Sequence, residues 1–263
     1  MRFQRVISIV MGEPWCITEA GHAAVRALVE KKASGVAMDL SEFITEPDQA
    51  RIENGVGIIP IKGVIGKGLG KLEKSCGACD LMDVETAVRA FAADKTVTTI
   101  LLDVDSPGGV VGGVPELADL IADVDETKRV TAFTEGQMCS AAYWLACGAR
   151  EIIATPSSEV GSIGVYMPWM DSTAAFAAQG VKVEVIKNTG GTFKGMGMPG
   201  TSLTDDQRAH LQDRVDEIFG MFADHVTANR HTSTEAMRGQ TFMGKSAKKA
   251  GLVDRVGSYQ TAV

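Results

Sequence analysis

Cys139 and Ser140 are adjacent nucleophilic side chains in the stretch GQMCSAAYWLA, between an apolar β-like run and an alanine-rich helix-like run. Ser140 begins the helical run, so its side chain lies near the positive end of the backbone dipoles. An N-cap is the ordinary role for a serine at such a position. A nucleophile is the alternative role, and it requires a base for the hydroxyl proton and donors for an oxyanion.

The stretch Ser106-Pro107-Gly108-Gly109 directly follows an apolar run, residues 97–104, that is typical of a buried strand. Ligands of parallel sheets bind at the carboxyl ends of the strands. Paired glycines let the backbone approach a substrate closely and direct an N–H at a developing oxyanion. The stretch alone is also compatible with a plain turn. Together with a serine after a later strand, it favours acyl-transfer chemistry.

No histidine lies in an expected strand-end loop, so the base for Ser140 must be sought elsewhere. The four histidines fall in expected helices or at their ends: His22, His210, His225 and His231. A lysine can replace histidine when apolar surroundings lower the pKa of its ammonium group from about 10.4 toward 7. Lys194 is the only charge in the apolar stretch NTGGTFKGMGMPG, and Lys187, after the run VKVEVI, is the second candidate.

The cysteines offer competing chemistry. Cys139 is expected to be a buried structural thiol, because adjacent residues do not share a face and nothing electropositive lies beside it. Cys76-Gly77-Ala78-Cys79 is a CxxC, which raises zinc or redox chemistry as an alternative. A structural zinc site needs about four ligands, and the sequence holds no second CxxC and no HxxxH. We expect neither a metal nor a cofactor.

Composition limits the class of protein. The chain has 263 residues, 45% hydrophobic and 22% charged, with a net charge of −7. This acidic balance argues against a general binder of nucleic acid or anionic membranes. No apolar run reaches the roughly 20 residues of a membrane span, and the N-terminus lacks a full signal-peptide pattern. Five cysteines without signs of export favour reduced thiols in a cytoplasm-like compartment.

Strand-like runs alternate with helix-like segments of about ten residues, which favours βαβ units and a mostly parallel sheet. The expected strands are residues 6–10, 55–65, 97–104, 130–134, 150–155, 162–167 and 181–186. The expected helices are 18–32, 83–93, 116–125, 140–148 and 172–179. Thr18 is expected to cap the first of them, and Gly180 to end the last. A further, long helix is expected after the capping box of Thr204 and Gln207. Residues 33–54 are polar and are expected to form a linker or mobile arm.

Five motifs in a fixed order resemble the signal peptide peptidase A family of serine–lysine peptidases. They are SPGG, GQMCSAAYWLA, VGSIGV, TGGTFKG and GKSAKKAGLVDRVG, and the match runs from about residue 55 to 256. The leader GEPWCITEAG looks most like the prophage and tailed-phage head maturation branch. The resemblance implies a ClpP/crotonase-like α/β fold of ββα units, with a helical C-terminal region. It also implies a leader and linker at 1–54 and a peptidase domain at 55–263.

The resemblance further assigns roles to individual residues. It implies Ser140 as nucleophile and Lys194 as general base, with the N–H groups of Gly108 and Ala141 as the oxyanion hole. Substrate contacts are implied for Gly109, Ser162 and Ile163. The family usually has glycines just after the nucleophile, whereas Ala141 and Ala142 stand here. An alanine still provides the N–H.

The resemblance also implies partners and a location. The expected substrates are proteins or peptides, above all phage scaffold, portal or capsid proteins. The expected assembly is a homo-oligomeric ring without a membrane anchor or nucleic acid, in the host cytoplasm or inside the prohead, with the dyad formed within or between subunits. The alternatives are a bacterial protein-degrading relative, a crotonase-like acyl-CoA enzyme and a noncatalytic capsid assembly component.

Overall fold

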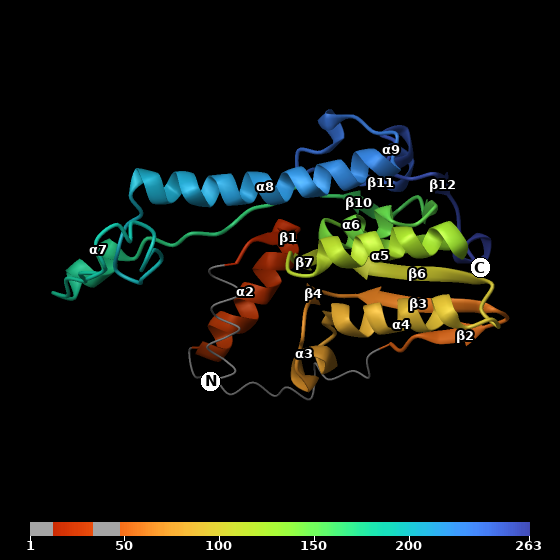
Figure 1. Ribbon diagram of the computed structural model, residues 1–263, viewed down its shortest axis with the longest axis horizontal. Helices are drawn as coiled ribbons and strands as arrows, with labels where there is room; N and C mark the ends of the chain where they lie inside the picture. The colour runs from red at the N-terminus through yellow and green to blue at the C-terminus, as the bar shows by residue number, and fades with distance from the viewer. Residues whose placement is uncertain (1–12, 34–47) are drawn as a thin grey trace.

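The computed structural model describes residues 13–33 and 48–263. The expected strand at 6–10 and most of the expected linker at 33–54 lie outside these residues. The described chain forms an α/β fold of two sheets with helices packed on them (Figure 1). The predicted α/β class, the mostly parallel sheet and the helical C-terminal region are confirmed.

The larger sheet is built on three parallel strands: β3 (Val56–Lys62), β6 (Thr99–Ser106) and β8 (Val130–Cys139). β6 lies between the other two and is parallel to both. The whole order is β11-β10-β8-β6-β3-β2, and β9 pairs with β8 and β12. The remaining strands are β2 (Arg51–Glu53), β9 (Glu151–Ala154), β10 (Glu159–Gly161), β11 (Thr241–Met243) and β12 (Arg255–Val256).

The smaller sheet brings distant segments together. Its order is β1 (Trp15–Ile17), β7 (Gly108–Val110), β4 (Ile65–Gly66) and β5 (Cys79–Asp80). β1 is antiparallel to β7, whereas β4 is parallel to both β7 and β5. β1 and β2 are therefore parts of the expected 1–54 leader that pair directly with strands of the expected 55–263 domain.

Helices cover one face of the larger sheet and follow the expected positions closely. Those that pack there are α4 (Leu81–Ala93), α5 (Val114–Thr127) and α6 (Ala141–Cys147), and α8 (Asp205–Asn229) crosses α6 (Figure 1). The others are α2 (Glu19–Ala33), α3 (Lys71–Ser75), α7 (Thr173–Ala178) and α9 (Gly244–Lys249), with short 3-10 turns η2 (Thr234–Ala236) and η3 (Tyr259–Thr261).

The alternation of β6 explains how the sheet is buried on both faces. Ile100, Leu102 and Val104 point into the main core under the helices. Leu101 points to the opposite face, where it joins a smaller cluster that includes Phe133. Period-two alternation of side chains produces these two faces. Tyr259 of η3 covers the second cluster, with its ring edge on Phe133 at a centroid distance of 5.5 Å.

Two expected strands are wrong. Residues 162–167 do not continue as a strand, because Gly161 and Ser162 both have positive φ and turn the chain away after β10. Residues 181–186 alternate apolar and polar side chains but have no strand partner in the described part of the chain. They belong to a segment, residues 167–203, that extends past the start of α8, away from α6 and β7 (Figure 1).

The expected helix boundaries are confirmed where capping chemistry was readable. Thr18 accepts a hydrogen bond from the Gly21 N–H ahead of α2. Thr204 and Gln207 form both bonds of the capping box of α8. The chain leaves α7 through Gly180, which has a φ of 71°. Among the helices of the described ranges, none is both long and apolar enough to cross a membrane.

Candidate active site

Ser140 sits on a strained turn between β8 and α6. Its φ is 56° and its ψ is −118°, in a region that non-glycine residues rarely adopt. Both backbone groups are fixed: the N–H donates to the Gly161 carbonyl at 2.7 Å, and the carbonyl accepts from the Trp144 N–H at 2.9 Å. Such a conformation costs on the order of 1–3 kcal/mol and clusters at functional sites.

The Ser140 hydroxyl is buried and unused for structure. Ser140 is the N-cap residue of α6 by position, as the ordinary reading of the sequence expected, but its side chain makes no capping bond. The residue is 1% exposed, and its Oγ has no nitrogen or oxygen hydrogen-bond partner in the described part of the chain; the polar group beside it is the thiol of Cys16, a weak hydrogen-bonding group. Leaving a buried hydroxyl unpaired costs about 1–3 kcal/mol. Both costs fall on one residue, a combination that is common at functional sites.

α6 holds this turn in place because it is buried on every side. All seven of its residues are buried, which is typical of a helix with apolar side chains all round. Ala141 and Ala142 are completely buried, so larger side chains would not fit there without rearrangement. Trp144 stacks on Phe222 of α8 with ring centroids 4.5 Å apart.

Gly108 of the SPGG stretch lies directly against Ser140, whereas Gly109 lies against Ile65. Gly108 has a φ of 102°, and a Cβ there would lie 3.0 Å from Ser140 Cβ and 2.2 Å from the Cys16 carbonyl oxygen. A Cβ on Gly109 would lie 2.0 Å from the Ile65 carbonyl oxygen. Only glycine fits at these two positions. The backbone of β7 therefore passes next to Ser140.

The two N–H groups expected to form an oxyanion hole flank the Ser140 turn. The Ala141 N–H is the first of α6 and makes no hydrogen bond within the described residues. The Gly108 N–H donates to Ser106 Oγ over 3.2 Å, and that hydroxyl donates to the Gly63 carbonyl at 2.6 Å. Ser106 thus orients the glycine turn, a role that sequence reasoning missed. The spacing Ser-x-Gly, typical of a local side-chain turn, is the signal that could have suggested it.

Lys194 is not brought to Ser140 within this chain. Its neighbour Phe193 packs on His210, near the start of α8, with ring centroids 4.6 Å apart. Trp144, one turn after Ser140, packs instead on Phe222. These two contact points are separated by about 18 Å along α8, at 1.5 Å per residue. Lys194 is exposed, and the second candidate, Lys187, donates to the Thr192 carbonyl at 2.8 Å.

Cys139 and Cys16 both lie near Ser140 as neutral thiols. Cys139 is completely buried, and its thiol donates to the Glu159 carbonyl at 3.6 Å. Burial raises the pKa of Cys139 to about 12, which removes the thiolate that a cysteine nucleophile needs. Cys16 of β1 is also completely buried, and its thiol lies against the Ser140 side chain. Sequence reasoning did not place Cys16 at the site.

Ser162 and Ile163, the expected substrate contacts after β10, line a cavity beside the turn. The Ser162 N–H donates to the Gln240 carbonyl at 2.8 Å, and the Ile163 carbonyl accepts from the Gly239 N–H at 3.0 Å. The cavity has a volume of about 420 Å³ and extends from Ile17 of β1 to Phe219 of α8. It is large enough for one or two side chains of a bound peptide.

The other titratable candidates do not converge on Ser140. His225 lies on α8, 3.4 Å from the Asp119 carboxylate on α5. His22 is buried between the rings of Trp15 and Tyr166. Cys76 of the CxxC is exposed, whereas Cys79 is buried with its pKa raised to about 12 by desolvation. No group of three or more potential metal ligands occurs in ranges 13–33 and 48–263.

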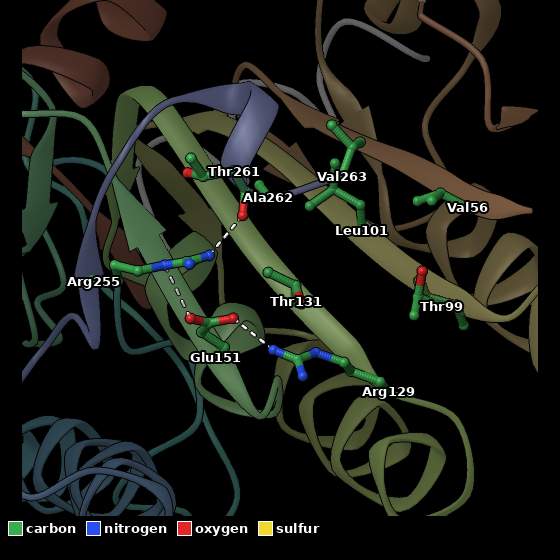
Figure 2. Close-up of a pocket in the computed structure, with 11 residues that line it drawn as sticks. Val56, Thr99, Leu101, Arg129, Thr131, Glu151, Arg255, Thr261, Ala262 and Val263 are labelled. Carbon is green, nitrogen blue, oxygen red and sulfur yellow. Dashed lines mark hydrogen bonds and ion pairs between the residues drawn. The ribbon is translucent and has the colours of Figure 1, made fainter. Parts of the chain in front are cut away.

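A second cavity, of about 380 Å³, lies at the opposite end of the parallel strands (Figure 2). It is lined by residues at the beginnings of β3, β6, β8 and β9 and by the C-terminal residues. Its charged groups are already paired: Glu151 bridges Arg129 at 2.7 Å and Arg255 at 3.2 Å. Ligands in parallel sheets bind at the other end of the strands, so this cavity is not the candidate active site.

Comparison with known proteins connects this geometry to a family. The model of Peptidase family S49 matches residues 122–263. Capsid assembly protease C of Escherichia phage lambda is 34% identical over 223 residues, covering 82% of this chain and 50% of that protein. Head-tail preconnector protein GP5 of Enterobacteria phage P21 is 31% identical over 242 residues, covering 89% and 48%. The chain spans about half the length of these curated relatives.

More distant similarities extend beyond phages. Protease 4 of Haemophilus influenzae is 25% identical over 253 residues, covering 90% of this chain and 39% of that protein. Among solved structures, a mutant of ClpP1 from Listeria monocytogenes has a TM-score of 0.48 at 13% identity, covering 78% of this chain and 93% of its own. An enoyl-CoA hydratase/isomerase family member has a TM-score of 0.42 at 15% identity, covering 82% and 72%.

Proposed function

The chain belongs to peptidase family S49, and we propose that it is a serine endopeptidase with Ser140 as nucleophile and Lys194 as general base. The observation that carries this proposal is the Ser140 turn. Its hydroxyl is buried without a nitrogen or oxygen partner among the described residues, its φ is 56°, and the Gly108 backbone lies against it. Backbone strain and an unpaired hydroxyl both lower the free energy of unfolding of the protein. A nucleophilic role for Ser140 accounts for both, because it requires a defined angle of attack and a hydroxyl that is free to react.

The proposed reaction uses the groups on either side of Ser140. Lys194 accepts the proton of the Ser140 hydroxyl, and Oγ attacks the carbonyl carbon of the scissile peptide bond. The oxyanion receives hydrogen bonds from the Ala141 N–H and from the Gly108 N–H, which exchanges its long bond to Ser106 for a charged acceptor. The protonated lysine then gives its proton to the leaving amine, and water hydrolyses the acyl-enzyme.

The base comes from a neighbouring copy of the chain in this proposal. Segment 167–203 carries Lys194 away from its own Ser140 (Figure 1). The segment also exposes large apolar side chains, which suits a surface covered in an assembly. They are Met170 (59% exposed), Val181 (46%), Val185 (36%), Ile186 (97%), Phe193 (47%) and Met198 (49%). A head-to-tail contact of this kind closes into a ring and places each lysine beside the next subunit's serine.

The proposed substrates are proteins of a phage head. The similar proteins of phages lambda and P21 are named for capsid assembly and for the head–tail preconnector. We propose scaffold, portal or capsid proteins as substrates, cleaved in the host cytoplasm or inside the prohead. We propose Gly109, Ser162 and Ile163 as contacts for an extended segment of such a protein, and Ser162 and Ile163 line the cavity of about 420 Å³.

A fluorophosphonate probe followed by mass mapping tests the nucleophile. We expect the assembled protein to be labelled on Ser140 and the Ser140→Ala variant to remain unlabelled. Co-expression with candidate head proteins should yield cleavage products with the unmodified chain and none with Ser140→Ala. Labelling elsewhere, or an assembled protein that neither reacts nor cleaves, would contradict the proposal and favour a noncatalytic assembly component.

A further inference from the structure

The groove next to Ser140 is filled by a strand of the same chain. β1 runs antiparallel to β7, with Ile17 opposite Gly108 and Trp15 opposite Val110. On its other edge, the Trp15 N–H donates to the Tyr166 carbonyl at 2.9 Å, and the Tyr166 N–H donates to the Trp15 carbonyl at 3.1 Å. β1 therefore lies between two segments that both approach the nucleophile, β7 through Gly108 and residues 162–166 through Gly161.

Cys16, at the centre of β1, occupies the space in which a substrate carbonyl would react. Its thiol lies against the Ser140 side chain, and its carbonyl oxygen lies 2.2 Å from the position that a Cβ on Gly108 would take. Both Cys16 and Ser140 are almost completely shielded from solvent. Burial raises the pKa of the Cys16 thiol to about 12, so it is present as a neutral plug and not as a base. No peptide bond can reach Ser140 while Cys16 is there.

We propose that Trp15–Ile17 is an inhibitory strand that occupies the peptide-binding groove, and that it must leave before a substrate strand can pair with β7. This inference rests on the proposed function, because a blocked groove matters only if Ser140 attacks peptide bonds. The occupant is a named segment of the chain itself. Its antiparallel register beside Gly108 is one that an extended peptide can adopt in its place.

The way β1 is anchored makes such an exchange feasible. Trp15 and Ile17 pack in a small cluster with side chains of α2 and β7 that is separate from the main core. Release of β1 therefore leaves most of the core intact, apart from the contact of Cys16. Trp15 Nε1 and Tyr166 Oη are buried there without hydrogen-bond partners among the described residues. Each such unpaired group costs about 1–3 kcal/mol, which lowers the free energy needed to detach β1 from its neighbours.

A substrate strand can re-form the backbone hydrogen bonds that are lost when β1 leaves. Backbone hydrogen bonds to β7 and to Tyr166 do not depend on side-chain identity, so an incoming peptide makes the same type of bonds. Thr18 follows β1 immediately; its N–H donates to the Pro107 carbonyl at 3.0 Å and its side chain caps α2. β1 and α2 are therefore expected to move together, with loss of this bond to Pro107 in addition to the pairing of β1 with β7.

A reversible crosslink tests whether β1 must move. Trp15 and Tyr166 form a hydrogen-bonded antiparallel pair, for which Cα atoms lie about 5.5 Å apart, within the range of a disulfide. In the double variant Trp15→Cys/Tyr166→Cys, oxidation should lower fluorophosphonate labelling of Ser140 and cleavage of a protein substrate by roughly tenfold or more. Reduction should restore both. The unmodified protein and Trp15→Cys alone, taken through the same redox cycle, control for the five native cysteines.

A variant that weakens the packing of β1 should increase labelling of Ser140, and hydrogen exchange provides an independent measurement. Ile17→Asp places a charge in the small apolar cluster that holds β1. β1 should therefore detach more often, and labelling of Ser140 should accelerate several-fold. Hydrogen exchange should be faster at the amides of Trp15 and Tyr166 in this variant, and in the unmodified protein once the probe is bound.

The outcomes separate this inference from the proposed function. Equal labelling of the oxidised and reduced double variant would overturn the inhibitory strand while leaving Ser140 as nucleophile. Unchanged exchange at Trp15 after probe binding would overturn it as well. Absence of labelling in every variant, including Ile17→Asp, would contradict the proposed function itself and the inference with it.

Discussion

Ser140 and Gly108 form a complementary pair at the residue scale. The positive φ of Ser140 turns its side chain toward β7, and Gly108 lacks the Cβ that would otherwise lie 3.0 Å from Ser140 Cβ. The Ser106 hydroxyl fixes the backbone before Gly108, because it donates a hydrogen bond to the Gly63 carbonyl and accepts one from the Gly108 N–H. The close approach of Ser140 to the Gly108 backbone thus depends on the absence of a Cβ at Gly108 and on the Ser106 hydroxyl that holds the Gly108 N–H.

Gly108→Ala is expected to destabilise the protein and abolish Ser140 labelling. The new Cβ meets the Cys16 carbonyl and takes a φ of 102°, which together cost on the order of 1–3 kcal/mol or more. Thermal unfolding and probe labelling measure the two effects. Gly112→Ala is the matched control, because a Cβ there meets nothing within 4 Å. Similar melting temperatures and labelling for the two variants would contradict this view of β7.

Cys139→Ala should keep most of the activity, whereas Ser140→Ala should lose it. Cys139 bonds Glu159 and has its pKa raised to about 12 by burial, so it supplies packing and not a thiolate. The expected cost of removing its sulfur is a modest loss of stability, about 1 kcal/mol. Cleavage assays on both variants decide between the adjacent nucleophiles, and the reverse pattern would reassign the reaction to Cys139.

Sequence patterns located the site only in part at this scale. The resemblance implied that Gly108 and Ser140 belong to one site, and the structure places the Gly108 backbone against Ser140. The positive φ of Ser140 was not predictable, since it arises from the bond to Gly161 and the burial of α6. Cys16 was missed because β1 is three residues long and pairs with a segment far away in the sequence.

α8 is the element that links the site to segment 167–203. It is anchored by the stack of Phe222 on Trp144 and has an exposed N-terminal half. Phe222→Ala should lower the free energy of unfolding by about 3–5 kcal/mol, since a completely buried ring is replaced by a cavity. Met221→Ala, at a position 45% exposed, is the control and should cost far less. Denaturant titration of both variants gives the difference, and equal losses would argue against this anchor.

The contact of α8 with α5 should make stability depend on pH. Burial lowers the pKa of His225, and the Asp119 carboxylate opposes this only partly. Because the folded pKa lies below the unfolded value of about 6.5, protonation favours the unfolded state, and stability falls as pH drops through that value. The melting temperature should therefore fall more between about pH 7.5 and about pH 5.5 in the unmodified protein than in His225→Gln. Parallel pH profiles would remove His225 as the cause.

Sequence periodicity predicted most elements and failed where tertiary context decides. The runs that became β3, β6, β8 and β9 are buried in the sheet, as continuous apolar runs indicate. Residues 181–186 have a strand-like alternation, yet no strand among the described residues pairs with them. Residues 162–167 were misassigned because the positive φ of Ser162 redirects the chain into the groove. Periodicity describes the faces of an element and does not report its partners.

The whole molecule separates Ser140, the proposed nucleophile, from Lys194, the proposed base. β7, α6 and β10 converge on Ser140, whereas segment 167–203 projects from the other end of α8 with Lys194 (Figure 1). This arrangement suits a ring in which each subunit supplies a serine to one site and a lysine to the next. Dilution below the assembly concentration should then abolish cleavage, and light scattering recorded in parallel should show that activity follows the oligomer. Full activity of a strictly monomeric species would contradict this dependence.

Complementation between two inactive variants tests the shared site most directly. Ser140→Ala and Lys194→Ala are prepared separately, each confirmed to assemble, then dissociated and mixed in equal amounts. A site between subunits is intact wherever a Lys194→Ala chain provides Ser140 and its neighbour, a Ser140→Ala chain, provides Lys194. Random mixing should therefore restore about a quarter of the unmodified activity. Mixed oligomers that stay as inactive as either parent would contradict a Ser140–Lys194 site formed across the subunit boundary.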